Sequence, residues 1–177
     1  PPCLVDETAE IVKAARDIIA GASLDYNLPC IAEKSVIVVE CVADQLIQQM
    51  REYGALQITD PQQMAALREV CIQKGAANKQ LVGKSPAVIL AAAGLPVPAK
   101  VPKLIILETA ADDPLVVTEQ LMPVLPIVRV DNFEQGLALA LKVEDGLHHT
   151  AIMHSQNVSR LNKAAHLMQT SIFVKNG

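Results

Sequence analysis

The sequence is poor in aromatic residues and in runs of positive charge. Its 177 residues contain no tryptophan, two tyrosines and two phenylalanines, so a core must be built mainly from alanine, leucine, isoleucine and valine. Aromatic platforms for stacking nucleic-acid bases are therefore scarce. The 15 Lys and Arg side chains are interspersed with 19 Asp and Glu, which leaves a net charge of −4 and no basic run to follow a phosphate backbone. We expect no nucleic-acid partner.

Long apolar runs and recognisable cysteine frameworks are also missing. A charged residue or a proline interrupts every apolar stretch before it reaches the roughly 20 residues that span a bilayer. We therefore expect neither a membrane partner nor a signal peptide. The four cysteines, Cys3, Cys30, Cys41 and Cys71, match neither zinc-site spacing nor a compact disulfide framework. Free thiols, no metal and a cytoplasmic location are the expectation.

Apolar segments of two kinds alternate along the chain. Hydrophobic residues make up 51% of the sequence and charged residues 19%, which favours one folded domain over residues 1–177. Short β-branched or apolar runs predict strands, and runs with helical spacing lie between them. The predicted strands cover residues 4–5, 35–40, 103–108, 125–130, 149–153 and 171–174. This alternation predicts an α/β fold, an open, mostly parallel twisted sheet with helices on both faces.

Capping residues predict where several helices begin. Asp60 and Ser85 each precede a proline that can occupy the first helical turn. Asp131 with a glutamate three residues later resembles a capping box, and Ser155 is the predicted cap of the last helix. Pro126 is expected at the start of its strand, because proline has no N–H to donate inside a sheet.

The segment from residue 27 to residue 34 carries the first candidate for chemistry. Cys30 follows a proline between the first helix and the next strand, where a thiol is more exposed than inside a strand. Spacing alone favours a buried, structural role for any free cysteine. Cys3, Cys41 and Cys71 keep that interpretation, because the first two sit in or beside apolar strands and the third lies on the apolar face of a helix.

Two further segments carry weaker signals. Glu119 precedes an apolar loop, where a lone carboxylate is usually solvated or caps a helix. Three histidines, His148, His149 and His154, lie within seven positions. Neighbouring side chains on a strand point to opposite faces, so His148 and His149 should not serve one metal site. Neither segment identifies a function by itself.

Taken in order, these segments resemble the catalytic domain of the aldehyde dehydrogenase superfamily. The residues that carry the likeness are Cys30, Glu119 and the runs GLHHTAIMHSQNVSRLN (146–162) and TSIFVKNG (170–177). They are most similar to the CoA-acylating branch that serves ethanolamine and propanediol breakdown in bacterial microcompartments. The resemblance covers essentially the whole chain, and it raises Cys30 from a structural thiol to the expected nucleophile.

The resemblance implies a reaction and its participants. Cys30 attacks a short-chain aldehyde, hydride passes to NAD, and the thioester is transferred to coenzyme A. Glu119 is then expected to hold the nicotinamide ribose, and His149 to serve as a base toward the incoming thiol, with a structural role for His149 equally open. A separate NAD-binding domain and an oligomerisation segment belong to the family but not to this chain, which begins and ends in strand-like sequence. A homo-oligomer and a cytoplasmic or microcompartment location are implied for the whole protein.

Two alternatives come from other functional classes. The chain could be a non-catalytic α/β module that binds a partner, with Cys30 structural. It could also be a stand-alone cysteine acyl hydrolase. Substitution of Cys30 by alanine separates the enzyme domain from the non-catalytic module, because truncating a buried packing residue lowers stability and truncating an exposed nucleophile does not. Steady hydrolysis of a nitrophenyl ester by the chain alone would support the hydrolase.

Overall fold

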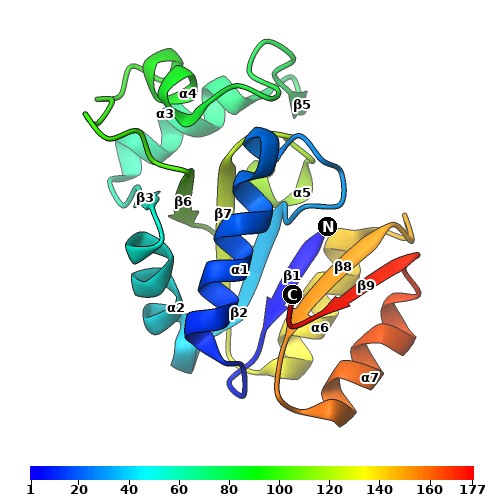
Figure 1. The fold of residues 1–177 in the computed structure, drawn as a ribbon. Coiled ribbons are helices and arrows are strands. Elements are labelled where there is room, and N and C mark those ends of the chain that lie inside the picture. Colours follow the sequence, from blue (N-terminus) through cyan, green and yellow to red (C-terminus); the bar gives the residue numbers. More distant parts are fainter.

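The computed structural model describes all residues from 1 to 177, arranged as alternating strands and helices (Figure 1). The strands are β1 (Pro2–Val5), β2 (Ser35–Val39), β3 (Ala55–Gln57), β4 (Ile72–Gln73), β5 (Ala76–Ala77), β6 (Leu104–Glu108), β7 (Val124–Val130), β8 (Thr150–His154) and β9 (Ile172–Lys175). The helices are α1 (Ile11–Ser23), η1 (Leu24–Asn27), α2 (Glu40–Glu52), α3 (Pro61–Cys71), α4 (Pro86–Ala92), α5 (Pro114–Val117), α6 (Phe133–Glu144) and α7 (Val158–Met168).

Seven of the strands form one sheet in the order β3-β6-β7-β2-β1-β8-β9. Every neighbouring pair in it is parallel. The short β4 and β5 pair with each other as a separate antiparallel ribbon. The predicted α/β class and parallel sheet are confirmed. The central strand β2 is buried along its whole length, as its unbroken β-branched sequence predicts for a strand covered on both faces.

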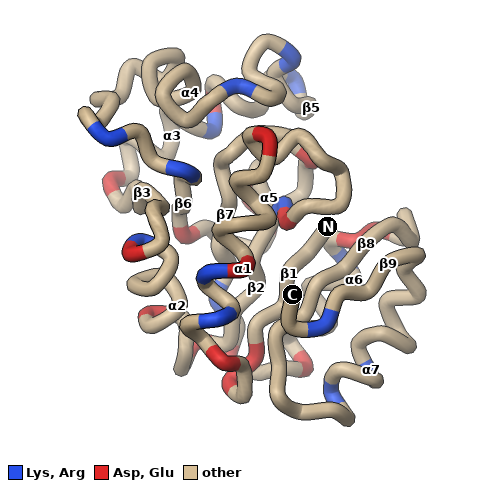
Figure 2. The backbone as a smooth tube through the Cα atoms, viewed as in Figure 1, with Lys and Arg blue, Asp and Glu red and all other residues tan.

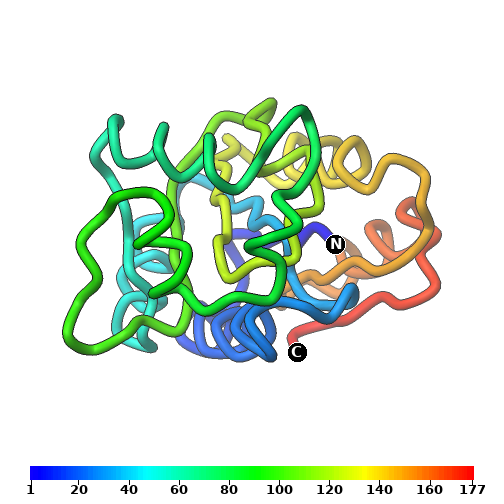
Figure 3. The backbone as a smooth tube through the Cα atoms, turned by 90° about the horizontal axis from the view of Figure 1, so that it is seen from above, coloured from blue at the N-terminus to red at the C-terminus, as the bar shows by residue number.

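Helices cover both faces of the sheet. On one face, α1 and α2 pack against alternate strand residues such as Val5, Val36 and Ile106. On the other face, α6 and α7 pack against Leu4 and Ile37, while α3, α4 and α5 cover the half of the sheet near β6. Alternate residues of one strand therefore enter different cores, as the two-residue repeat of a strand requires. Seen from above, the sheet lies between these helical layers (Figure 3).

Residues of both charge signs are interspersed along the backbone and occur in most of its helices and connections (Figure 2). No helix of the chain combines the length and the apolar character needed to cross a bilayer.

The helix caps agree only partly with the sequence prediction. Asp60 caps α3 by accepting a hydrogen bond from the backbone N–H of Gln63, and Ser85 occupies the cap position of α4 without a side-chain bond. The predictions for α6 and α7 are wrong by one and two residues. Asn132 and Asn157 are the actual caps, and each accepts from the N–H three residues later.

Strand ends also differ from the prediction. The edge strand β3 has three half-buried residues and too little apolar pattern to be recognised. Pro126 is the third residue of β7 rather than its first, and β7 is a central strand. The pairing of β7 with β2 begins only at Ile127. Pro126 therefore precedes the first residue pair of these two strands, and its missing N–H interrupts no pair between them.

Candidate active site

The reactive residues gather at the edge of the sheet where four parallel strands begin. A cavity of about 320 Å³ opens there. It is lined by Pro1, Cys30, Lys34, Val116, Val117, Thr118, Glu119, Val143, Glu144, Asp145, Leu147, His149 and Thr150. Most of these residues precede β1, β2, β7 and β8 or lie on the helices that lead into them, and Thr150 is the first residue of β8. Figure 3 looks onto this edge. Open α/β sheets usually bind ligands at the opposite, carboxyl edge.

The structure brings the three residues chosen from the sequence to this one cavity. Cys30 lies in a turn and is exposed, as predicted. Glu119 and His149 are exposed as well, and each comes from a different connection of the sheet. These residues lie far apart in the chain, and only the parallel order of the strands brings them to one side of the sheet.

The other cysteines differ from Cys30 in two ways. Cys3 and Cys71 are fully buried, and burial raises the pKa of both thiols, that of Cys71 to about 12. Both therefore stay protonated at neutral pH, in agreement with a structural role. The prediction for Cys41 is wrong, because this residue is exposed in the first turn of α2. Cys41 lies beyond the carboxyl end of β2, at the opposite edge of the sheet from the cavity.

A lysine and an asparagine hold the loop that carries Cys30. The Lys34 side chain is only 6% exposed, and its ammonium donates to the backbone oxygens of Asn27 (2.9 Å) and Pro29 (2.8 Å) and to the Asn27 side-chain oxygen. The Asn27 side-chain amide donates to the Glu33 carbonyl at 2.9 Å. Burial lowers the pKa of Lys34 to about 8, and the neighbouring Glu119, Glu33 and Cys30 oppose this shift. Sequence patterns assign no role to Lys34, because a single lysine before a strand is not a recognisable motif.

Glu119 is placed by its neighbour Gln120. The Gln120 side chain is fully buried and donates to the backbone oxygens of Leu115 and Val124, both at 3.1 Å. These bonds fix the connection between α5 and β7. The carboxylate of Glu119 makes no hydrogen bond or ion pair within the chain. Its two oxygens are thus available to accept hydrogen bonds from a ligand.

Two contacts hold His149 in place, one at its backbone and one at its ring. Its N–H donates to the buried carboxylate of Glu144 at 3.0 Å, and its Nδ1 lies 2.7 Å from the Thr150 hydroxyl. The hydrogen bond at Nδ1 leaves Nε2 as the ring atom free to exchange a proton with a ligand. Glu144 and Thr150 are functional neighbours that the sequence did not indicate.

The three neighbouring histidines do not converge. His148 has a left-handed backbone with φ of 52°, and its Nδ1 lies 3.1 Å from the Gln169 carbonyl. His154 is buried on β8, and burial lowers its pKa to about 4, so it stays neutral at pH 7. His148 and His149 precede the strand instead of lying on it, which corrects the predicted start of β8. No group of three or more His, Cys, Asp or Glu side chains is placed to hold a metal ion.

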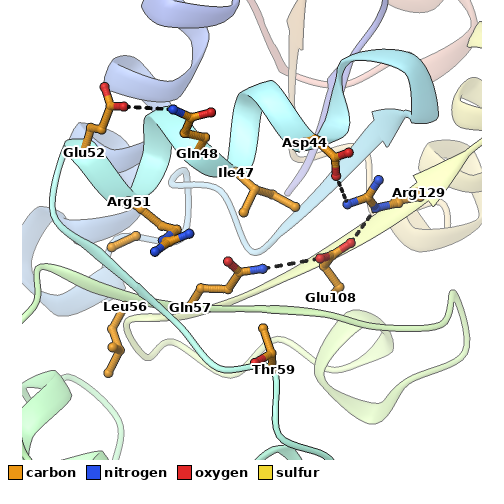
Figure 4. Close-up of a pocket in the computed structure, with 11 residues that line it drawn as sticks. Asp44, Ile47, Gln48, Arg51, Glu52, Leu56, Gln57, Thr59, Glu108 and Arg129 are labelled. Atoms are coloured by element: carbon orange, nitrogen blue, oxygen red, sulfur yellow. Dashed lines mark hydrogen bonds and ion pairs between the residues drawn. The ribbon is translucent and has the colours of Figure 1, made fainter.

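A second hollow lies at the carboxyl edge of the sheet, where Arg129 forms the centre of an ion-pair cluster (Figure 4). Arg129 donates to Glu108, to Asp44 at 2.6 Å and to Glu40 at 3.0 Å. Gln57 donates to the same Glu108 at 3.3 Å. These contacts link β7 with β6, α2 and the end of β3. No cysteine or histidine lines this hollow, and the mutual pairing of its charged side chains indicates a structural cluster.

Comparison with known proteins identifies the family. The aldehyde dehydrogenase family model matches residues 1–177. The chain belongs to the aldehyde dehydrogenase family. It is 67% identical, over 100% of its length, to a propanal dehydrogenase (CoA-propanoylating) from Citrobacter freundii, of which it covers 38%. The resemblance noted in the sequence is therefore confirmed, including its CoA-acylating branch.

Solved structures agree with this assignment. A propionaldehyde dehydrogenase from Rhodopseudomonas palustris, solved with bound CoA and an acylated cysteine, superposes with a TM-score of 0.96 at 45% identity. A propionaldehyde dehydrogenase from a fucose utilisation bacterial microcompartment of Clostridium phytofermentans superposes with a TM-score of 0.94 at 42% identity. Each match covers 100% of this chain and 40% of the solved chain. The chain thus spans about two fifths of the length of these aldehyde dehydrogenases.

Proposed function

We propose that residues 1–177 form the cysteine-bearing catalytic domain of an NAD-dependent, CoA-acylating aldehyde dehydrogenase. The observation that carries the proposal is the meeting of Cys30, Glu119 and His149 at one cavity. An exposed thiol, a free carboxylate and a histidine with an available Nε2 supply a nucleophile, a hydroxyl acceptor and a base. The related enzyme solved with an acylated cysteine supports the role of Cys30.

Cys30 acts twice in the proposed reaction. Its thiolate adds to the carbonyl carbon of the aldehyde, and the resulting oxyanion can accept a hydrogen bond from the backbone N–H of Cys30. Loss of hydride from that carbon leaves an acyl thioester on Cys30. The thiol of coenzyme A then attacks the thioester carbonyl, and the Cys30 thiolate leaves. The products are acyl-CoA and the free Cys30 thiolate, which begins the next cycle.

His149 and Glu119 assist different halves of this cycle. The Nε2 of His149 takes the proton of the coenzyme A thiol as that sulfur attacks, while Thr150 bonds the ring at Nδ1 and Glu144 accepts from the backbone N–H of His149. The residues at the cavity fit a nicotinamide nucleotide, because Glu119 offers an unused carboxylate to the two hydroxyls of a ribose. NAD, when bound, supplies the hydride acceptor.

The remaining parts of the proposal concern the whole protein. The 67% identity to a CoA-propanoylating enzyme favours propanal as the aldehyde, with acetaldehyde as the alternative. A further NAD-binding domain would account for part of the additional length of the relatives, and a homo-oligomer is expected of the whole protein. The related microcompartment enzyme supports a location inside such a compartment.

The direct test is CoA-dependent reduction of NAD by the intact protein with propanal as substrate. Cys30→Ser should abolish NADH formation, with a loss of at least about 10³-fold in kcat, because no other thiol lines the cavity. The matched control is Cys41→Ser, which removes the other exposed thiol and should keep wild-type turnover. Turnover in the Cys30→Ser variant would contradict the proposal. Steady ester hydrolysis without NAD or CoA would favour a cysteine hydrolase instead.

A further inference from the structure

The Cys30 loop, residues 24–34, has an unusual backbone before the cysteine. Three successive residues, Asp25, Tyr26 and Asn27, have φ angles of 45°, 54° and 62°. Each lies in the left-handed region, which costs a residue with a Cβ roughly 1–2 kcal/mol. None of the three is a glycine, for which this conformation carries no such cost. Such a run persists only where other contacts hold it in place.

Lys34 makes the contacts that hold this loop. A lysine ammonium has three N–H donors, and Lys34 directs them at three oxygens, two from Asn27 and one from Pro29. Asn27 is itself fully buried, and its amide group bonds the Glu33 carbonyl. The two ends of the turn that presents Cys30 are therefore joined through one buried cation. No carboxylate forms an ion pair with Lys34.

We propose that Lys34 is the positioning residue of the nucleophile: its charged ammonium holds residues 27–29 in the conformation that presents Cys30 to the cavity. The inference rests on the proposed function of Cys30 and adds to it the group that orients the thiol. Lys34 bonds oxygen atoms of the loop, so its effect on the reaction is exerted through the position of Cys30.

The charge of Lys34 is essential to this role. An uncharged amine has two N–H donors and leaves one of the three oxygens without its hydrogen bond. The ionisable groups that influence Lys34 are Glu33 and Cys30 on the loop itself and Glu119 before β7; Glu144 on α6 lines the same cavity. Because the pKa of Lys34 is about 8, the loop should loosen as the pH rises through 8.

The first measurement is hydrogen exchange of the Cys30 loop in the intact protein, expressed as protection relative to the intrinsic exchange rate at each pH. The variants are Lys34→Met, which keeps the length of the side chain without its charge, and Lys34→Arg, which stays charged throughout. Lys100→Met is the matched control, since Lys100 is exposed and makes no bond within the chain. Lys34→Met should lose about tenfold protection in residues 24–34 and keep wild-type protection in β2 and α1.

The pH dependence separates positioning from simple packing. Between pH 7 and pH 9 the wild-type loop should lose protection, whereas Lys34→Arg should show no such change and Lys34→Met should be loose at both values. Unchanged protection in Lys34→Met, faster exchange throughout its whole structure, or a Lys34→Arg loop as loose as that of Lys34→Met would each overturn the proposal.

The second measurement is turnover with propanal, NAD and coenzyme A. Lys34→Met should lower kcat by about 10²-fold, the effect expected when a reacting group is displaced by about 1 Å, with the KM for coenzyme A changed much less. Lys34→Arg should recover most of that loss. The two proposals fail separately: turnover by Cys30→Ser would contradict Cys30 as the nucleophile, while the exchange results on the loop do not depend on the reaction.

Discussion

At the scale of single residues, exposure divides the four cysteines into two pairs. Cys30 and Cys41 are exposed, and Cys3 and Cys71 are buried in the cores. The sequence pattern separates these pairs poorly, because Cys3 lies within an apolar strand and Cys41 lies directly after one. What distinguishes Cys30 from Cys41 is the edge of the sheet on which each lies, and that depends on strand direction.

Truncation of the exposed thiol should leave the fold intact. Cys30→Ala removes a side chain in a solvent-exposed turn, so the free energy of unfolding should change by less than about 0.5 kcal/mol. Cys71→Ala opens a cavity in the core that also contains Leu67, Ile89 and Leu107, and should lower the free energy of unfolding by about 1–2 kcal/mol. Chemical denaturation measures both. A strongly destabilised Cys30→Ala variant would favour a structural role for this cysteine and the non-catalytic alternative.

His149 should matter for the second half of the reaction only. Replacing it by alanine removes the base that we propose for the coenzyme A thiol, so acyl transfer should slow by about 10²-fold to 10⁴-fold while acylation of Cys30 continues. Rapid-quench mass spectrometry should then find the acyl-enzyme accumulating. His148→Ala is the matched control, because this histidine does not line the cavity. Equal losses in both variants would argue against a specific role for His149.

At the scale of elements, the sequence predicted what apolar periodicity determines. The strands β2 and β6 are apolar almost throughout, and their predicted ends differ from the observed ends by at most one residue. The caps of α6 and α7 were misplaced because two capable residues stand close together, as Ser155 and Asn157 do. Ser155 is instead fully buried and donates to Asp6 at 2.7 Å, a contact between residues 149 positions apart. No local pattern reveals such a partner.

Helix α6 lies close against the sheet at Gly136. A Cβ on this residue would lie 2.6 Å from the Cδ1 atom of Leu4 and 3.3 Å from the Cγ2 atom of Val130. Gly136→Ala should therefore destabilise the protein by about 1–3 kcal/mol, although alanine favours a helix more than glycine does. A double-mutant cycle with Leu4→Ala checks the cause, since the double variant should show a favourable coupling energy. A stabilised Gly136→Ala variant would show that α6 can move away from the sheet without cost.

At the scale of the whole molecule, parallel topology explains both the site and why it was hard to foresee. Cys30, Glu119 and His149 were found in the sequence only through resemblance to a family, because each alone has an ordinary structural explanation. The fold brings them together by starting β2, β7 and β8 at the same edge. Lys34 was not assigned a role, since its hydrogen-bond partners depend on a left-handed turn that the sequence does not indicate.

One buried carboxyl group couples the site region to the stability of the whole protein. Glu33 is 4% exposed, its Oε2 has no hydrogen-bond partner, and burial raises its pKa from 4.5 to about 7. The native state therefore holds this proton more tightly than the unfolded chain does. The resulting stabilisation is complete below pH 4.5 and is lost as the pH rises through 7.

Comparison with Glu33→Gln measures that contribution. The variant cannot ionise, so relative to it the wild type should lose stability between pH 4.5 and pH 8, by about 3 kcal/mol in total. Denaturation curves at several pH values give the difference. A constant difference across this range would mean that Glu33 keeps an ordinary pKa in the folded protein.

The most direct test of the central claim is to trap the acyl group on its residue. The intact protein is mixed with propanal and NAD in the absence of coenzyme A, digested, and analysed by mass spectrometry. The account predicts one propionyl group, attached to the peptide that carries Cys30, which disappears when coenzyme A is added. An acyl group on Cys41 or on no cysteine, while NADH is still produced, would contradict it.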